Sequence, residues 1–70
     1  MKNLFTEYLI KNGWKEISFL TYQFPHNKSI EIFFDNSNQI ELYIDKKRKS
    51  EKYIEKIEDL LSFLSDNKLI

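Results

Sequence analysis

Acidic and aromatic residues alternate with aliphatic ones along "SIEIFFDNSNQIELYID", residues 29–45, and are the best candidates for binding chemistry in the chain. Successive side chains of a strand point to opposite faces, so one face of this segment would be apolar and the other would carry acids around aromatic rings. Acids repel phosphates, and exposed aromatic residues mark protein contacts, so this face suits a basic protein surface. The candidate contact residues are Glu31, Phe33, Asp35, Glu41, Tyr43 and Asp45.

Catalytic chemistry is poorly supported by the residue types. The sequence contains one histidine, His26, one glycine, Gly13, and no cysteine. A histidine acid–base pair, a multi-histidine metal site, a thiol nucleophile and a glycine-rich phosphate loop therefore lack their residues. The exposed acids could bind a hard cation such as Mg²⁺, but a flat acidic sheet face is ordinarily only solvated. We expect a protein that is not an enzyme and that holds no metal or cofactor.

A second chemically distinct stretch is "KKRKSEK", residues 46–52, which carries five basic residues and one acid. The chain as a whole has a net charge of zero, so this run is a local feature and not part of a generally basic protein. Most such runs are soluble turns. Next to the N-terminus of a helix, however, the run would favour an anion such as phosphate.

Size and composition indicate one small domain spanning residues 1–70. Hydrophobic residues make up 41% of the chain and aromatic residues 16%, which is enough for a core, and no disulfide can assist it. The chain has ten Lys but one Arg and neither Ala nor Val, a choice typical of AT-rich coding in low-GC bacteria and their phages. Without a signal-like or membrane-spanning segment, we expect a cytoplasmic location, in the host cytoplasm for a phage protein.

The elements that must position these residues begin with a helix over residues 3–12, which Gly13 ends in a left-handed conformation. Trp14 then folds back onto the core. Residues 15–24, "KEISFLTYQF", form a strand whose inward face is ambiguous, and a bulge near Phe19–Leu20 would reconcile its two apolar patterns.

Residues 29–45 form a hairpin in which both apolar sets must share one face. A two-residue turn would pair odd-numbered with even-numbered positions and expose half of the apolar residues. A three-residue loop pairs even-numbered positions with each other, so the apolar residues of both strands share one face. A loop of residues 37–39 would place acids directly opposite acids, which is destabilising. A loop of residues 36–38 avoids both clashes, and we therefore expect it.

This register makes specific cross-strand pairs. It places Glu31 opposite Tyr43 and Phe33 opposite Glu41. It also puts Asn38 at the left-handed position of the loop, a conformation that Asn tolerates better than most residues. The two aromatic residues then become diagonal neighbours on the open face.

The last element is expected to be a helix from Ser50, as N-cap, to about Asp66. The resulting order is α-β-β-β-α, a two-layer α+β fold in which a three-stranded antiparallel meander has both helices on one face. The helical stripe that supports it consists of Ile54, Ile57, Leu61 and Leu64.

This order resembles that of the double-stranded-RNA-binding domain, and three stretches are similar to its contact regions: "TEYLIKNG", "PHNKSIEI" and "KKRKSEK". The resemblance implies binding of duplex RNA through shape and backbone contacts. The chain departs from the family pattern at Phe24, where a glycine is usual, and in the Ile and Leu residues of the last helix. The residues that the resemblance would place against RNA are Glu7, His26, Lys46, Lys47, Arg48 and Lys49.

Three functions remain open on the sequence. The first is a non-catalytic binding or inhibitor protein that docks on a basic protein surface through the acidic and aromatic sheet face, as an anti-CRISPR-like phage factor would. The second is duplex RNA binding through the first helix, the first hairpin loop and the basic run. The third is a homodimer or structural subunit that buries the same sheet face.

Overall fold

The computed structural model describes residues 2–35 and 37–70, so Asn36, the first residue of the expected hairpin loop, lies outside the described residues. Two helices and five strands make up this part of the chain. The helices are α1 (Lys2–Lys11) and α2 (Ile57–Asp66), and the strands are β1 (Lys15–Ser18), β2 (Thr21–Gln23), β3 (Ile30–Phe34), β4 (Gln39–Ile44) and β5 (Lys47–Tyr53).

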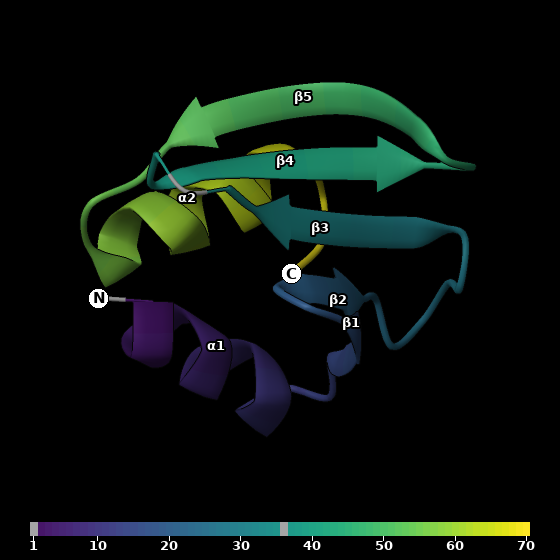
Figure 1. Cartoon of the computed structure of the whole chain (residues 1–70), viewed down its shortest axis with the longest axis horizontal. Coiled ribbons are helices and arrows are strands. Elements are labelled where there is room, and N and C mark those ends of the chain that lie inside the picture. Colours follow the sequence, from purple (N-terminus) through teal and green to yellow (C-terminus); the bar gives the residue numbers. More distant parts are fainter. Residues whose placement is uncertain (1, 36) are drawn as a thin grey trace.

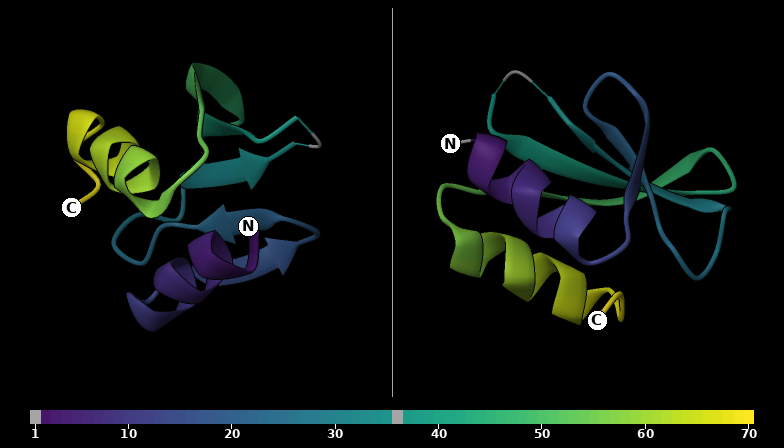
Figure 2. Two further views of the ribbon diagram at one scale, coloured as in Figure 1. Left: turned by 90° about the vertical axis from the view of Figure 1, so that its left-hand side faces the viewer. Right: turned by 90° about the horizontal axis from the view of Figure 1, so that it is seen from below.

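The strands form one antiparallel sheet in chain order, from β1 at one edge to β5 at the other. Figure 1 shows the sheet curving over the helices, and the view from below in Figure 2 places α1 and α2 on the same side of it. The expected α+β class, an antiparallel meander with two helices, is confirmed. The sheet has five strands instead of three, for two separate reasons.

The first reason is that residues 15–24 form two strands joined by a tight turn, not one bulged strand. Ser18 pairs with Thr21, so Phe19 and Leu20 make the turn between β1 and β2. Leu20 has a left-handed backbone, with a φ of 55°, and its side chain packs against the core. Phe19 is 79% exposed. The turn explains why the segment showed two conflicting apolar patterns.

The second reason is that the basic run is a strand, which corrects the expected start of the last helix. Asp45 and Lys46, with φ of 54° and 68°, form a two-residue turn typical of hairpins, and β5 returns along β4. Ser50 does not cap a helix; its hydroxyl donates to Asn67 Oδ1 at 3.1 Å. A helix from Ser50 would have left the backbone groups along one edge of β4 unpaired. The helix α2 begins at Ile57 instead.

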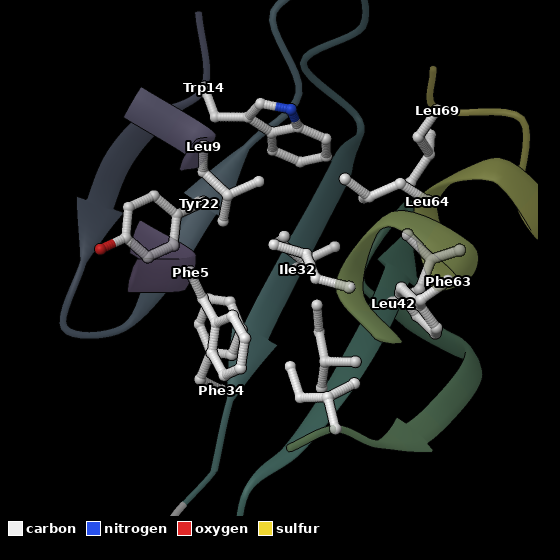
Figure 3. Close-up of a cluster of buried hydrophobic side chains, with 13 residues drawn as sticks. Phe5, Leu9, Trp14, Tyr22, Ile32, Phe34, Leu42, Phe63, Leu64 and Leu69 are labelled. Carbon is white, nitrogen blue, oxygen red and sulfur yellow. The ribbon is translucent and has the colours of Figure 1, made fainter. Parts of the chain in front are cut away.

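The core fills the space between the sheet and both helices (Figure 3). Phe5 of α1 stacks on Phe34 of β3 with ring centroids 6.1 Å apart, and Tyr22 meets Phe34 edge-on at 6.0 Å. Trp14 is buried, as expected, and Gly13 has the expected left-handed φ of 92°. The buried side chains are Phe5, Leu9, Trp14, Tyr22, Ile32, Phe34, Ile40, Leu42, Ile54, Leu60, Phe63, Leu64 and Leu69.

The register expected for the β3–β4 hairpin is confirmed. Glu31 pairs with Tyr43 and Phe33 pairs with Glu41. Asn38 has a φ of 62°, the left-handed conformation that the loop requires. The alternating apolar residues of both strands therefore point into the core, and the acidic and aromatic residues point to the opposite side.

Candidate functional site

The face of the sheet turned away from the helices is here called the outer sheet face. Figures 1 and 2 show no described helix crossing it. Strand pairing aligns its residues across the sheet, because paired residues of neighbouring strands share a face. One cross-strand row on this face consists of Lys15, Gln23, Glu31, Tyr43 and Arg48. The next row consists of Thr21, Phe33, Glu41 and Glu51, and it is followed by the pair Gln39 and Tyr53.

Tyr43 is held in orientation by its neighbour on β4. Its hydroxyl donates a hydrogen bond to Glu41 Oε1 at 2.7 Å. Because the carboxylate accepts the phenolic hydrogen, the pKa of Tyr43 lies above its ordinary value of 10.0. The ring therefore presents a fixed aromatic surface at the centre of the outer sheet face.

Two cations from the β4–β5 hairpin stand beside the acids of this face. Lys46 Nζ lies 3.1 Å from Glu31 Oε2. Arg48 Nη1 lies 3.3 Å from Glu51 Oε1 and 3.9 Å from Glu41 Oε2. The side chains of Glu31 and Glu41 are each 14% exposed, whereas those of Lys46 and Arg48 are 81% and 55% exposed. The acids are thus central and largely covered, and the cations are peripheral and solvated.

A shallow hollow of about 290 Å³ lies on the outer sheet face and is lined by Thr21, Glu31, Phe33 and Tyr43. Its lining residues carry two aromatic rings, one carboxylate, the Thr21 hydroxyl and the Tyr43 phenol. The faces of aromatic rings and carboxylates both attract cations. The hollow is therefore chemically suited to an organic cation.

Two of the six predicted contact residues have structural roles in turns. Asp35 Oδ1 accepts hydrogen bonds from the backbone N–H groups of Ser37, at 2.8 Å, and Gln39, at 3.0 Å, which closes the β3–β4 hairpin. Asp45 lies in the β4–β5 turn, and its N–H donates to the carbonyl of Ser29 at 3.0 Å. The structure brings the other four predicted residues together between these two turns.

The residues expected to contact RNA are dispersed. Glu7 lines a groove between α1 and α2. His26 lies in the loop between β2 and β3, where its exposed ring meets Phe24 edge-on at 5.3 Å. This loop and the β4–β5 turn do meet at one end of the sheet, joined by the hydrogen bond between Asp45 and Ser29. Glu7 instead shares its groove with Ile57, the first residue of α2.

The basic run does not surround the N-terminus of a helix, which corrects the premise of the anion site. Lys47 and Arg48 are in β5, and Lys49 is the extra residue of a bulge in that strand. The first turn of α2 carries Glu58 and Asp59, whose negative charges disfavour a phosphate there. A row of charged residues on an edge strand also prevents pairing with other chains, which gives the lysines a structural use.

Sequence reasoning missed the contribution of β5 to the outer sheet face. Arg48, Glu51 and Tyr53 all lie on this face, opposite residues of β4. The side of β5 that faces the helices carries Ser50 and Lys52, so the strand has no apolar residue to mark its inward face. The bulge at Lys49 further disrupts the two-residue periodicity.

Over residues 2–35 and 37–70, no group of three or more His, Cys, Asp or Glu side chains is arranged to hold a metal ion. Neither α1 nor α2 is long and apolar enough to span a bilayer. The resemblance to the double-stranded-RNA-binding domain rests on three short stretches, one of which is a strand where that family has the start of a helix. No protein-family model, curated protein or solved structure matched the chain.

Proposed function

We propose that the chain is a non-catalytic binding protein that docks on a basic protein surface through its outer sheet face. The observation that carries this proposal is the uncovered hollow in which Phe33 and Tyr43 lie beside Glu31. Grouped aromatic residues that remain accessible are enriched at protein interfaces, where they provide most of the binding free energy.

The placement of charge supports a basic partner. The central acids Glu31 and Glu41 are covered by neighbouring side chains, whereas Lys46 and Arg48 extend into solvent. Exposed ion pairs contribute little to stability, so a partner can displace these two cations at small cost. The acids would then pair with cations of the partner in an interface from which water is excluded.

A basic protein surface is commonly one that holds nucleic acid, and occupying it would exclude the nucleic acid. A small protein that blocks the nucleic-acid groove of a host defence enzyme, as anti-CRISPR proteins of phages do, fits this behaviour. The AT-rich residue usage of the chain supports that setting, in which the protein would act in the cytoplasm of the host.

Site-specific photo-crosslinking tests the proposal in cells that naturally produce the protein. A benzoylphenylalanine at Tyr53, which is 54% exposed on the outer sheet face, is compared with one at Ile10, which is 53% exposed on α1. We expect a crosslink to one basic protein from position 53 only, lost when Phe33 and Tyr43 are both changed to Ser in a variant that still folds. Equal crosslinking from both positions, or a folded double variant that keeps its partner, would overturn the proposal.

A further inference from the structure

The geometry points to an arginine side chain of the partner as the group that enters the hollow of Thr21, Glu31, Phe33 and Tyr43, where it displaces Lys46 from Glu31. This inference rests on the proposed function and specifies its chemistry. It depends on three features: a Glu31 carboxylate with unused acceptor sites, two aromatic rings in the lining, and Lys46, which contacts the same carboxylate from a neighbouring hollow.

The carboxylate of Glu31 has capacity for a further donor. Lys46 Nζ, 3.1 Å from Oε2, is the one hydrogen-bond partner of this carboxylate among the described residues. A carboxylate offers about four lone-pair sites. Since the Glu31 side chain is only 14% exposed, water reaches the remaining sites poorly. A guanidinium, with paired parallel N–H groups, could use both oxygens at once.

The aromatic residues favour arginine over lysine. Phe33 on β3 and Tyr43 on β4 are diagonal neighbours, and both line the hollow. A planar, weakly hydrated guanidinium stacks on such rings while it pairs with a carboxylate, whereas an ammonium is compact and strongly hydrated. The hydrogen bond from Tyr43 to Glu41 fixes one ring in advance, which lowers the entropic cost of binding.

Thr21 adds a hydrogen-bond acceptor at the rim. Its hydroxyl donates to the carbonyl of Phe19 at 3.1 Å, so the hydroxyl proton is already used. The oxygen lone pairs remain able to accept an N–H. A guanidinium has five N–H donors and no acceptor, so it matches a lining of acceptors and ring faces.

Lys46, which lines the neighbouring hollow, acts as an internal competitor for the Glu31 carboxylate. Its ammonium bonds to Glu31 from the β4–β5 turn while the side chain stays 81% exposed. Such a pair is weak and easily exchanged. Removing the Lys46 side chain should therefore increase the affinity for an arginine-rich ligand beyond the general effect of losing one positive charge.

An NMR titration with two synthetic probes, an oligoarginine and an oligolysine peptide of equal length, tests the inference. We expect the oligoarginine peptide to bind more tightly and to shift the backbone amide signals of Glu31, Phe33 and Tyr43 most. Glu31→Gln should weaken that binding by about tenfold, since hydrogen bonds between charged groups are the strong ones. Glu51→Gln, which removes the same charge from the edge of the same face, is the control and should have a smaller effect.

A second pair of variants tests the competition. Lys46→Ala should raise the affinity for oligoarginine by about two- to fivefold, the range expected when a weak ion pair is removed. Lys11→Ala removes the same charge from the exposed end of α1 and is the matched control. An equal rise in both variants would mean that only net charge matters and would overturn the inference.

The outcomes separate this inference from the proposed function. If both peptides bind equally and Glu31→Gln and Glu51→Gln have equal effects, the inference that an arginine side chain enters the hollow is overturned. The proposal of a basic partner surface would still stand. No peptide binding together with a specific crosslink from position 53 would likewise overturn only the hollow. No peptide binding and no specific crosslink would overturn both.

Discussion

The Tyr43 hydroxyl donates to Glu41 Oε1 at 2.7 Å, and this pair lies two residues apart on the same face of β4. The bond satisfies one oxygen of a carboxylate that is only 14% exposed, while Arg48 lies 3.9 Å from the other oxygen. Both oxygens of Glu41 thus have partners within the chain, whereas Glu31 has lone pairs that can accept a further hydrogen bond. The pair also fixes the aromatic ring that the proposed interface uses.

Tyr43→Phe should change the alkaline behaviour of the protein. Folding favours the neutral phenol, because the pKa of Tyr43 is raised above 10.0 chiefly by its hydrogen bond to Glu41. Its stabilising effect is therefore fully present below about pH 10 and is lost as the pH rises through the higher folded value. We expect the variant to have a lower Tm at neutral pH and to lack one late step in the tyrosinate absorbance titration.

The matched control is Tyr53→Phe, which removes a hydroxyl without a hydrogen-bond partner among the described residues. It should leave the Tm at neutral pH nearly unchanged. Burial raises the pKa of Tyr22 as well, so one late-titrating tyrosine should remain in Tyr43→Phe and two should remain in Tyr53→Phe. An unchanged late titration in Tyr43→Phe would contradict the hydrogen bond to Glu41.

Asp59→Asn should weaken the start of α2. Asp59 Oδ2 accepts the backbone N–H groups of Glu55, at 2.9 Å, and Lys56, at 3.2 Å, and these bonds lower the pKa of Asp59 below 3.8. Its contribution to stability is therefore present above about pH 4 and is lost as the pH falls through the lower folded value. We expect a lower Tm at neutral pH and a shallower acid dependence of the Tm.

Glu58→Gln is the control for Asp59, since it removes the same charge from the same turn without a hydrogen bond in the described part of the chain. It should change the Tm less, through the helix dipole alone. Parallel loss of stability on acidification in Asp59→Asn and the wild type would show that the two backbone bonds do not set the pKa of Asp59.

The β3–β4 hairpin could be predicted because several independent signals agreed. Apolar alternation fixed the parity, the cost of opposed acids selected between two loops, and Asn38 supplied a left-handed position. The strand β5 could not be predicted in the same way. It is held by the backbone groups of β4 and by a two-residue turn without glycine, and its inward residues Ser50 and Lys52 are polar. Local sequence carries little trace of such a strand.

The candidate site was predictable in its centre and not at its edges. Glu31, Phe33, Glu41 and Tyr43 follow from alternation alone. The positions of Lys46 and Arg48 beside these acids follow only from the β4–β5 pairing. The hairpin alone predicted an acidic surface. In the structure the acids of this surface are paired with cations of the β4–β5 hairpin, and aromatic rings lie between the pairs.

Asn38→Val should destabilise the hairpin that positions the site. Asn38 has a φ of 62°, which a β-branched residue adopts only with strain, so we expect a loss of about 1 to 2 kcal/mol in the free energy of unfolding. Asn38→Gly should be tolerated, and Ser37→Val controls for the added apolar side chain. The measurement is chemical denaturation, and equal stabilities of Asn38→Val and Asn38→Gly would contradict the left-handed conformation.

The protein should be a monomer in solution. A dimer formed through the outer sheet face would bring the central acids Glu31 and Glu41 of both copies to the same interface, while Lys46 and Arg48 stay at its periphery. Opposed acids are unfavourable when water is excluded. We expect the monomer mass in light scattering and a Tm independent of concentration. Twice that mass, reduced to the monomer by Tyr53→Ser, would favour the homodimer.

Duplex RNA should bind weakly, and the position of the basic run explains why. If Lys46, Lys47, Arg48 and Lys49 all contacted phosphates, the logarithm of the affinity would fall steeply with the logarithm of salt concentration, with a slope of about −3 to −4. The structure instead pairs two of these residues with acids and begins α2 with Glu58 and Asp59.

We therefore expect a slope shallower than about −2 and no measurable binding at physiological salt. The triple change of Lys46, Lys47 and Lys49 to Glu should accordingly alter duplex RNA binding little. A steep slope that disappears in this triple variant, but persists when Phe33 and Tyr43 are changed to Ser, would move the functional surface from the outer sheet face to β5. The acids that pair with Lys46 and Arg48 would then hold these two cations in position to contact phosphates. They would not bind cations of a partner protein.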